Sequence, residues 1–138
     1  MADGALDFWI GTWDCAWEGG RGSNVVTREM DGHVVVERFE ALGDEPFTGL
    51  SVSVVDPATG GWRQTWVDST GSYWAFVGGA RTDGTVVFGT PERVDSEQLY
   101  KRLIFSEITP DGFFWRWESS PDRRTWTVRW AMEYRRRA

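Results

Sequence analysis

The chain has 138 residues, of which 41% are hydrophobic and 26% are charged, and its formal net charge is −6. This length and composition fit one globular domain, so we expect a single domain over residues 1–138. The acidic balance argues against a protein that binds nucleic acid through clustered basic side chains, and no apolar run reaches the ~20 residues that a membrane-spanning helix needs.

The N-terminal segment is unusual in its aromatic content. Residues 7–22, DFWIGTWDCAWEGGRG, place Trp9, Trp13 and Trp17 four positions apart and then continue into glycines. Positions four apart share a face in a helix and also in a strand, but the glycine and threonine within this run disfavour a helix. We therefore predict a strand here, preceded by at most a short helical turn near residues 3–8.

Turn signals recur along the chain at nine places, mostly as Asp-Gly, Pro-Asp or paired glycines, and they separate ten segments. After the first, the segments are SNVVTREM, HVVVERFEA, TGLSVSVV, WRQTWVD, SYWAFV, TVVFGT, EQLYKRLIFSEI, FFWRWES and TWTVRWAMEYR. Their β-branched and aromatic residues and their alternation are typical of strands. The pattern predicts an all-β protein, either a closed or nearly closed antiparallel up-and-down barrel of about ten strands or a sandwich of two sheets.

Alternation along each predicted strand indicates which side chains share a face. In the last segment Trp126, Val128, Trp130, Met132 and Tyr134 fall on one face, while arginine, threonine and glutamate residues fall on the other. We expect the first face to point into the protein.

A few polar side chains share faces with the tryptophans, and a buried polar group needs a partner. By this criterion Gln64 and Arg102, together with Glu37 or Asp68, are expected inside an aromatic interior, which is typical of a small-molecule pocket. The predicted ligand-binding residues are Trp13, Trp17, Phe39, Trp62, Gln64, Trp66, Tyr100, Arg102, Trp115, Trp117 and Trp130. The same pattern also fits a barrel filled by its own side chains, with Arg102 and Glu37 as an internal ion pair or facing solvent.

The motif Gly11-Thr12-Trp13 resembles the G-x-W signature of the calycin superfamily, which includes the lipocalins and the fatty-acid-binding proteins. The resemblance implies that Trp13 closes one end of a lipocalin-like barrel. It also implies that an arginine of the last strand, Arg135 or Arg136, packs over the Trp13 ring.

A longer resemblance covers nearly the whole chain. DFWIGTWD at residues 7–14, VVERF at residues 35–39, DPATGGW at residues 56–62 and the aromatic C-terminal strand pair are similar to a family of small bacterial calycin-like barrels. The resemblance implies the barrel fold, and it brings no settled activity with it.

The sequence offers little for metal, cofactor or nucleophile chemistry. A related type of barrel, the nitrobindin-like haem proteins, needs a histidine, but His33 is the only one here and follows an Asp-Gly turn at an expected barrel rim. One histidine and the single Cys15 cannot form a zinc site, so we predict no metal and no cofactor. We expect Cys15 to be a small buried hydrophobic residue, and the lack of a second cysteine and of a signal-like N-terminus predicts a cytoplasmic protein.

Three functions remain open from the sequence. The first is binding of a small hydrophobic, aromatic or planar molecule inside a tryptophan-lined barrel. The second is a cofactor-free cyclase, isomerase or decarboxylase that uses the same pocket on a natural-product-like intermediate, with Glu37, Asp68 and His33 as candidate proton-transfer residues. The third is an interaction module that meets a protein partner, or a second copy in a homodimer, through exposed tryptophans.

Overall fold

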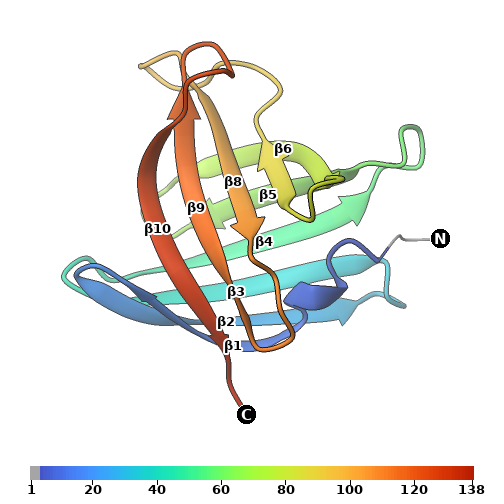
Figure 1. Ribbon diagram of the computed structural model, residues 1–138, viewed down its shortest axis with the longest axis vertical. Coiled ribbons are helices and arrows are strands. Elements are labelled where there is room, and N and C mark those ends of the chain that lie inside the picture. The colour runs from blue at the N-terminus through green and yellow to red at the C-terminus, as the bar shows by residue number, and fades with distance from the viewer. Residues whose placement is uncertain (1–3) are drawn as a thin grey trace.

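All ten predicted segments form strands, and the first strand pairs with the last. The computed structural model describes residues 4–138 (Figure 1). Its elements are η1 (Asp7–Trp9), β1 (Gly11–Trp17), β2 (Gly20–Glu29), β3 (Val34–Gly43), β4 (Phe47–Val55), β5 (Trp62–Asp68), β6 (Tyr73–Ala80), β7 (Val86–Gly89), β8 (Tyr100–Ser106), β9 (Gly112–Ser120) and β10 (Thr127–Arg136). Each strand is antiparallel to its chain neighbours, so the sheet is a closed up-and-down barrel and the two-sheet sandwich is excluded.

A single short helix precedes the barrel. The 3-10 helix η1 overlaps the turn predicted near residues 3–8, of which residue 3 lies outside the described part of the chain. Within residues 4–138 η1 is the only helix, and no helix in this range is long and apolar enough to cross a membrane.

The barrel has two different ends. At the end we call closed, η1 leads into β1. The opposite, open end is bordered by the turns β1–β2, β3–β4 and β5–β6 and by two loops, residues 90–99 and residues 121–126. In Figure 1, η1 lies at the lower right, whereas β8, β9 and β10 extend upward to the two open-end loops.

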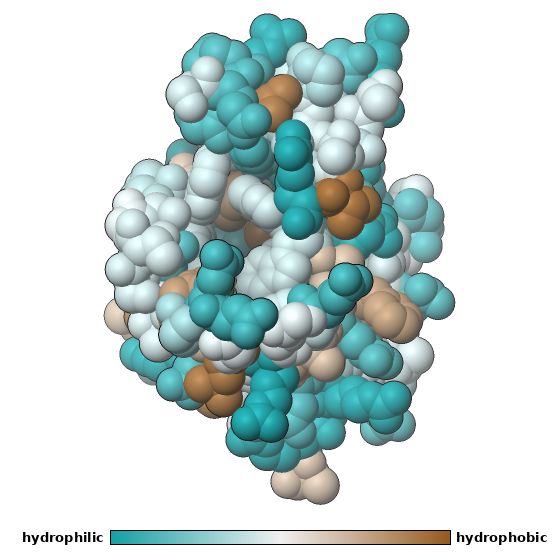
Figure 2. All heavy atoms as spheres, turned by 90° about the vertical axis from the view of Figure 1, so that its left-hand side faces the viewer, coloured by the Kyte–Doolittle hydropathy of each residue, from teal (hydrophilic) through white to brown (hydrophobic). Residues whose placement is uncertain are grey.

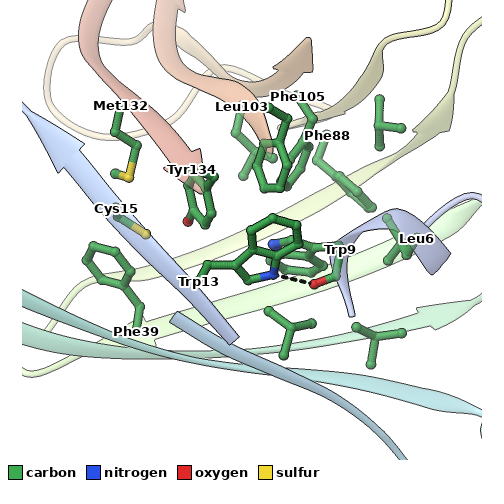
Figure 3. Close-up of a cluster of buried hydrophobic side chains, with 14 of the residues drawn as sticks. Leu6, Trp9, Trp13, Cys15, Phe39, Phe88, Leu103, Phe105, Met132 and Tyr134 are labelled. Carbon is green, nitrogen blue, oxygen red and sulfur yellow. Dashed lines mark hydrogen bonds between the residues drawn. The ribbon is translucent and has the colours of Figure 1, made fainter. Parts of the chain in front are cut away.

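Aromatic side chains fill the closed end. The Trp9 and Phe105 rings meet edge to face with centroids 5.3 Å apart, and Trp13 meets Phe113 in the same way at 5.0 Å. The indole Nε1–H of Trp13 donates a 2.8 Å hydrogen bond to the backbone carbonyl of Trp9 (Figure 3). Both indoles are fully buried, so this end of the barrel is packed solid.

Arg136 of the last strand covers the Trp13 ring at the closed end of the barrel. Its guanidinium carbon lies 4.2 Å from the ring centroid, and its nitrogens donate hydrogen bonds to the carbonyls of Phe8, Ile10 and Pro110. Of the two arginines expected over Trp13, the structure selects Arg136.

A register shift in β10 corrects one predicted face. Trp130, Met132 and Tyr134 point into the barrel as expected, but the pairing with β9 slips between Val128 and Trp130. An extra residue in one strand reverses the orientation of the side chains that precede it. Val128 is therefore 51% exposed, and the prediction that it shares the inner face of Trp130 is wrong.

Candidate functional site

A cavity of about 270 Å³ lies in the barrel between the packed closed end and the open end. Residues from η1, β3 to β6, β8 to β10 and the β5–β6 turn line it. They are Trp9, Glu37, Phe39, Phe47, Gln64, Trp66, Asp68, Ser72, Trp74, Phe76, Leu103, Phe105, Trp115, Trp117, Trp130, Met132 and Tyr134. Figure 2 looks at the left-hand side of Figure 1 and shows the surface hollowed among the open-end side chains.

The walls of this cavity are built from aromatic rings that support one another. Eleven of the seventeen lining residues are aromatic. Trp66 and Trp74 are direct cross-strand partners, and Trp74 meets Trp117 edge to face at 5.4 Å. Trp115 and Trp130 form another edge-to-face pair at 5.4 Å. Because each ring is held by its neighbours, the apolar surface is fixed in place without a ligand.

Glycines make room for two of the indoles. A Cβ on Gly49 would lie 2.1 Å from the Trp66 ring, and a Cβ on Gly20 would lie 2.6 Å from that of Trp17. A Cβ on Gly22 would approach the Trp17 ring to 3.1 Å and a backbone oxygen to 2.3 Å. The glycine-rich stretch after the first strand therefore forms a hairpin whose inner side is covered by Trp17.

Glu37 is the central polar group of the cavity wall. Its Oε1 accepts a 2.6 Å hydrogen bond from the Ser51 hydroxyl, and its Oε2 accepts a 2.7 Å hydrogen bond from the Asn24 amide. The same amide nitrogen donates at 2.9 Å to the Tyr134 hydroxyl. These residues belong to four different strands, so the closed sheet brings them together.

Burial changes the ionisation of this polar group and its neighbours. Desolvation raises the pKa of Glu37 above its ordinary value, although the hydrogen bonds from Ser51 and Asn24 partly offset this. Burial also raises the pKa of the Cys15 thiol to about 12 and that of Tyr134 well above its usual 10. Cys15 and Tyr134 are thus neutral hydrogen-bonding groups near neutral pH, and Cys15 is buried as predicted.

A second carboxylate stands at the open end of the cavity. Burial opposes the ionisation of Asp68, but hydrogen bonds from Thr70, Trp66 and the backbone lower its pKa. The Trp66 Nε1–H donates to it at 2.9 Å, and the Thr70 hydroxyl donates at 2.6 Å. Asp68 is therefore an ionised group that also orients one wall indole.

The structure brings together part of the predicted ligand-binding set. Six of these residues line the cavity: Phe39, Gln64, Trp66, Trp115, Trp117 and Trp130. Trp13 and Trp62 are instead buried in the hydrophobic core, each at most 1% exposed. Trp17 packs behind the wall, against Phe39 at 6.2 Å and Trp130 at 5.1 Å.

Arg102 does not lie in the interior, contrary to the prediction. Its neighbour Leu103 lines the cavity, so Arg102 projects to the outside of β8. There its Nε donates a 2.7 Å hydrogen bond to Glu118, and its guanidinium lies 3.8 Å from the Trp126 ring centroid. Arg116 pairs with the same carboxylate at 3.1 Å. The proposed internal ion pair between Arg102 and Glu37 is therefore wrong.

Tyr100 accompanies Arg102 on the outer side of β8. The guanidinium of Arg123 lies 4.2 Å from its ring centroid, and that of Arg93 lies 5.2 Å away. The prediction failed because β8 carries apolar residues on both faces. Ile104 shares a parity with both residues and is buried, yet it is an outward-facing side chain.

Two of the three proton-transfer candidates share the cavity, and the third lies away from it. Glu37 and Asp68 both line the cavity. His33 is an exposed residue of the β2–β3 turn at the closed end, so it does not share a site with them.

Several lining residues were not selected from the sequence. Trp74 and Phe76 alternate in the segment SYWAFV, and their pairing with Trp66 and Gln64 places them on the inner face. That alternation could have identified Trp74 and Phe76 as inward-facing residues. Asn24, which holds Glu37, gave no such signal because its partners come from β3 and β10.

Within residues 4–138 no group of three or more histidine, cysteine, aspartate or glutamate side chains could hold a metal ion. Neither the family models nor the curated proteins include a match to this chain. The geometry of the cavity is therefore the basis for assigning a function.

Proposed function

We propose that this protein binds a small, largely apolar, aromatic or planar molecule inside a calycin-like barrel. The observation that carries the proposal is the unfilled cavity of about 270 Å³ beside a closed end that is packed solid. Its volume lies just below the ~300–1,000 Å³ found for small-molecule sites. A flat ring system that buries about 250 Å² there would gain about 6 kcal/mol before the cost of association.

Polar groups that could orient a ligand are also present. Gln64 donates from Nε2 to the Ser53 hydroxyl at 3.0 Å, and its carbonyl oxygen makes no hydrogen bond within the described residues. The buried Trp9 Nε1–H likewise has no partner in this part of the chain. A few free polar groups in an otherwise apolar pocket fix the orientation of a ligand and make its binding specific.

Binding can be tested with N-phenylnaphthylamine, which is uncharged at neutral pH and fluoresces more strongly in apolar surroundings. We expect saturable enhancement of its emission together with quenching of the intrinsic tryptophan fluorescence. Trp66→Leu, which removes a wall ring, should weaken binding at least fivefold. Trp126→Phe is the matched control, because Trp126 lies outside the barrel on Arg102. Absence of saturable binding by the unaltered protein would contradict the proposal.

A second candidate is a proton-transfer enzyme that acts on a bound intermediate. It is favoured by one observation, the raised pKa of a carboxyl group, Glu37, that lines the cavity. Glu37→Gln discriminates the two functions. In an enzyme, this substitution would abolish turnover of the substrate and leave the affinity for N-phenylnaphthylamine unchanged. A carrier has no turnover to lose.

Association through exposed tryptophans has less support. All ten tryptophans lie within the described residues, and none of them is exposed. The exposed large hydrophobic residues on the outer faces of β4 and β5 are aliphatic: Leu50, Val52, Val54 and Val67.

A further inference from the structure

The charges around the cavity are unbalanced. Glu37 lies in its wall and Asp68 at its open end, and no lysine or arginine is among the seventeen lining residues. The remaining surface consists mainly of aromatic rings, whose faces carry partial negative charge. The buried Lys101 approaches the wall, with its Nζ 6.0 Å from the Trp74 ring centroid, but it is paired with Asp95 and Glu97. The charged groups of the lining itself are therefore only acidic.

Glu37 has no cationic partner within residues 4–138. The arginines on β8 and β9 that point outward pair with Glu118, and Lys101 pairs with Asp95 and Glu97. The only hydrogen bonds that Glu37 accepts in this part of the chain come from the neutral donors Ser51 and Asn24. A buried carboxylate without a counter-ion is costly, and a cation supplied by a ligand would remove that cost.

The Glu37 carboxyl has room for a further donor. A carboxylate offers about four acceptor positions. Ser51 occupies one on Oε1 and Asn24 occupies one on Oε2. Glu37 is itself a cavity-lining residue, so a ligand in the cavity lies beside this side chain.

We infer that the ligand carries a basic nitrogen, which binds as an ammonium group to Glu37 while its apolar body stacks against the indoles of the wall. This inference rests on the proposed binding function and specifies the chemical class of the ligand. The aromatic rings add cation–π attraction to the ion pair. A ligand with a carboxylate, in contrast, would meet two acidic groups and no basic lining residue.

Binding of such a ligand is coupled to protons. Because burial raises the pKa of Glu37, this carboxyl keeps its proton to a higher pH than a free glutamate does, and formation of the ion pair releases that proton to the buffer. The other titratable groups near Glu37 are Cys15 and Tyr134, which burial keeps neutral, and Asp68, whose lowered pKa keeps it ionised. Affinity for the amine should therefore rise as the pH rises through the folded-state pKa of Glu37.

Calorimetric titration with three matched compounds tests the inference: naphthylethylamine, naphthylethanol and naphthylpropionate. At neutral pH the amine should bind at least about tenfold more tightly than the alcohol, and the carboxylate should bind most weakly. Glu37→Gln should reduce the preference for the amine to less than threefold. It should leave the affinity for the alcohol within threefold, which a general structural defect would not do.

The pH dependence provides a test on the unaltered protein, which remains decisive if Glu37→Gln does not fold. Affinity for naphthylethylamine that rises with pH, while that for naphthylethanol stays constant, supports the inference. Equal affinities for the amine and the alcohol at neutral pH would overturn it. If N-phenylnaphthylamine still binds in that case, the proposed function stands and only the ligand class is wrong. If none of the four compounds binds, the proposed function itself fails.

Discussion

Trp13 and Arg136 are direct cross-strand partners of β1 and β10, and the guanidinium of Arg136 lies 4.2 Å from the indole centroid. The contact joins the first strand to the last at the point where the barrel closes. Since Arg136 also bonds three carbonyls outside these strands, it ties η1 and the β8–β9 turn to the closed end.

Arg136→Ala should destabilise the protein by about 1–3 kcal/mol, because it removes charge-assisted hydrogen bonds and a cation–π contact together. Urea unfolding followed by tryptophan fluorescence measures the loss. Arg135→Ala is the matched control. That side chain is 78% exposed and reaches only Glu133, at 3.7 Å, so its removal should change the unfolding midpoint little. Equal effects of the two substitutions would contradict the role given to Arg136.

Glu37→Gln should change how stability depends on pH. The folded-state pKa of Glu37 is raised, so this group favours folding below its ordinary pKa of 4.5, and that contribution is lost as the pH rises through the folded-state value. Without ligand, the unaltered protein should therefore lose stability relative to Glu37→Gln from about pH 4.5 upward. Thermal unfolding of both proteins over this range measures the difference. Parallel curves would show that Glu37 is not perturbed by burial.

Gly49→Ala should narrow the cavity. The added Cβ would lie 2.1 Å from the Trp66 ring, so the indole must move inward, at a cost of about 1–3 kcal/mol in stability. Affinity for N-phenylnaphthylamine should fall with it. Gly61→Ala is the control, because a Cβ there meets nothing closer than 3.5 Å. Unchanged affinity in Gly49→Ala would mean that the Trp66 position does not define the site.

Cys15 should be unreactive in the folded protein. Its thiol is buried and its pKa is raised to about 12, so the thiolate is nearly absent at mildly alkaline pH. Dithionitrobenzoate should react with it only at the rate of unfolding, and promptly in urea. Rapid labelling without denaturant would show that the interior near Cys15 is open to solvent.

Arg102→Met should lower stability by about 1–3 kcal/mol without affecting ligand binding, since Arg102 bonds Glu118 on the outside of the barrel. Arg124→Met is the control, because that side chain is exposed and its only hydrogen bond within the described residues is made by its backbone. A selective loss of ligand affinity in Arg102→Met would instead mean that Arg102 belongs to the ligand-binding site.

Much of the cavity wall could be predicted from the sequence because strand alternation is local. Phe39, Trp66, Trp115 and Trp130 were placed correctly from their neighbours along the chain. Alternation failed where a strand is apolar on both faces, as around Arg102, and where a register shift intervenes, as at Val128. Both errors depend on what lies beside the strand rather than on its own sequence.

The ten strands and the aromatic character of the interior follow from the sequence alone, because turn residues and period-two alternation act over a few residues. The position of Trp13 at the closed end was implied by the G-x-W resemblance and not by this pattern. That the closed end is packed while a cavity remains beyond it depends on how the strands close into a barrel. The tertiary structure also brings Asn24 and Ser51 into hydrogen bonds with Glu37, and Tyr134 into a hydrogen bond with Asn24. Hydrogen bonds between strands that are distant in the chain depend on how the barrel closes. That closure left Glu37 without a cationic partner among the described residues.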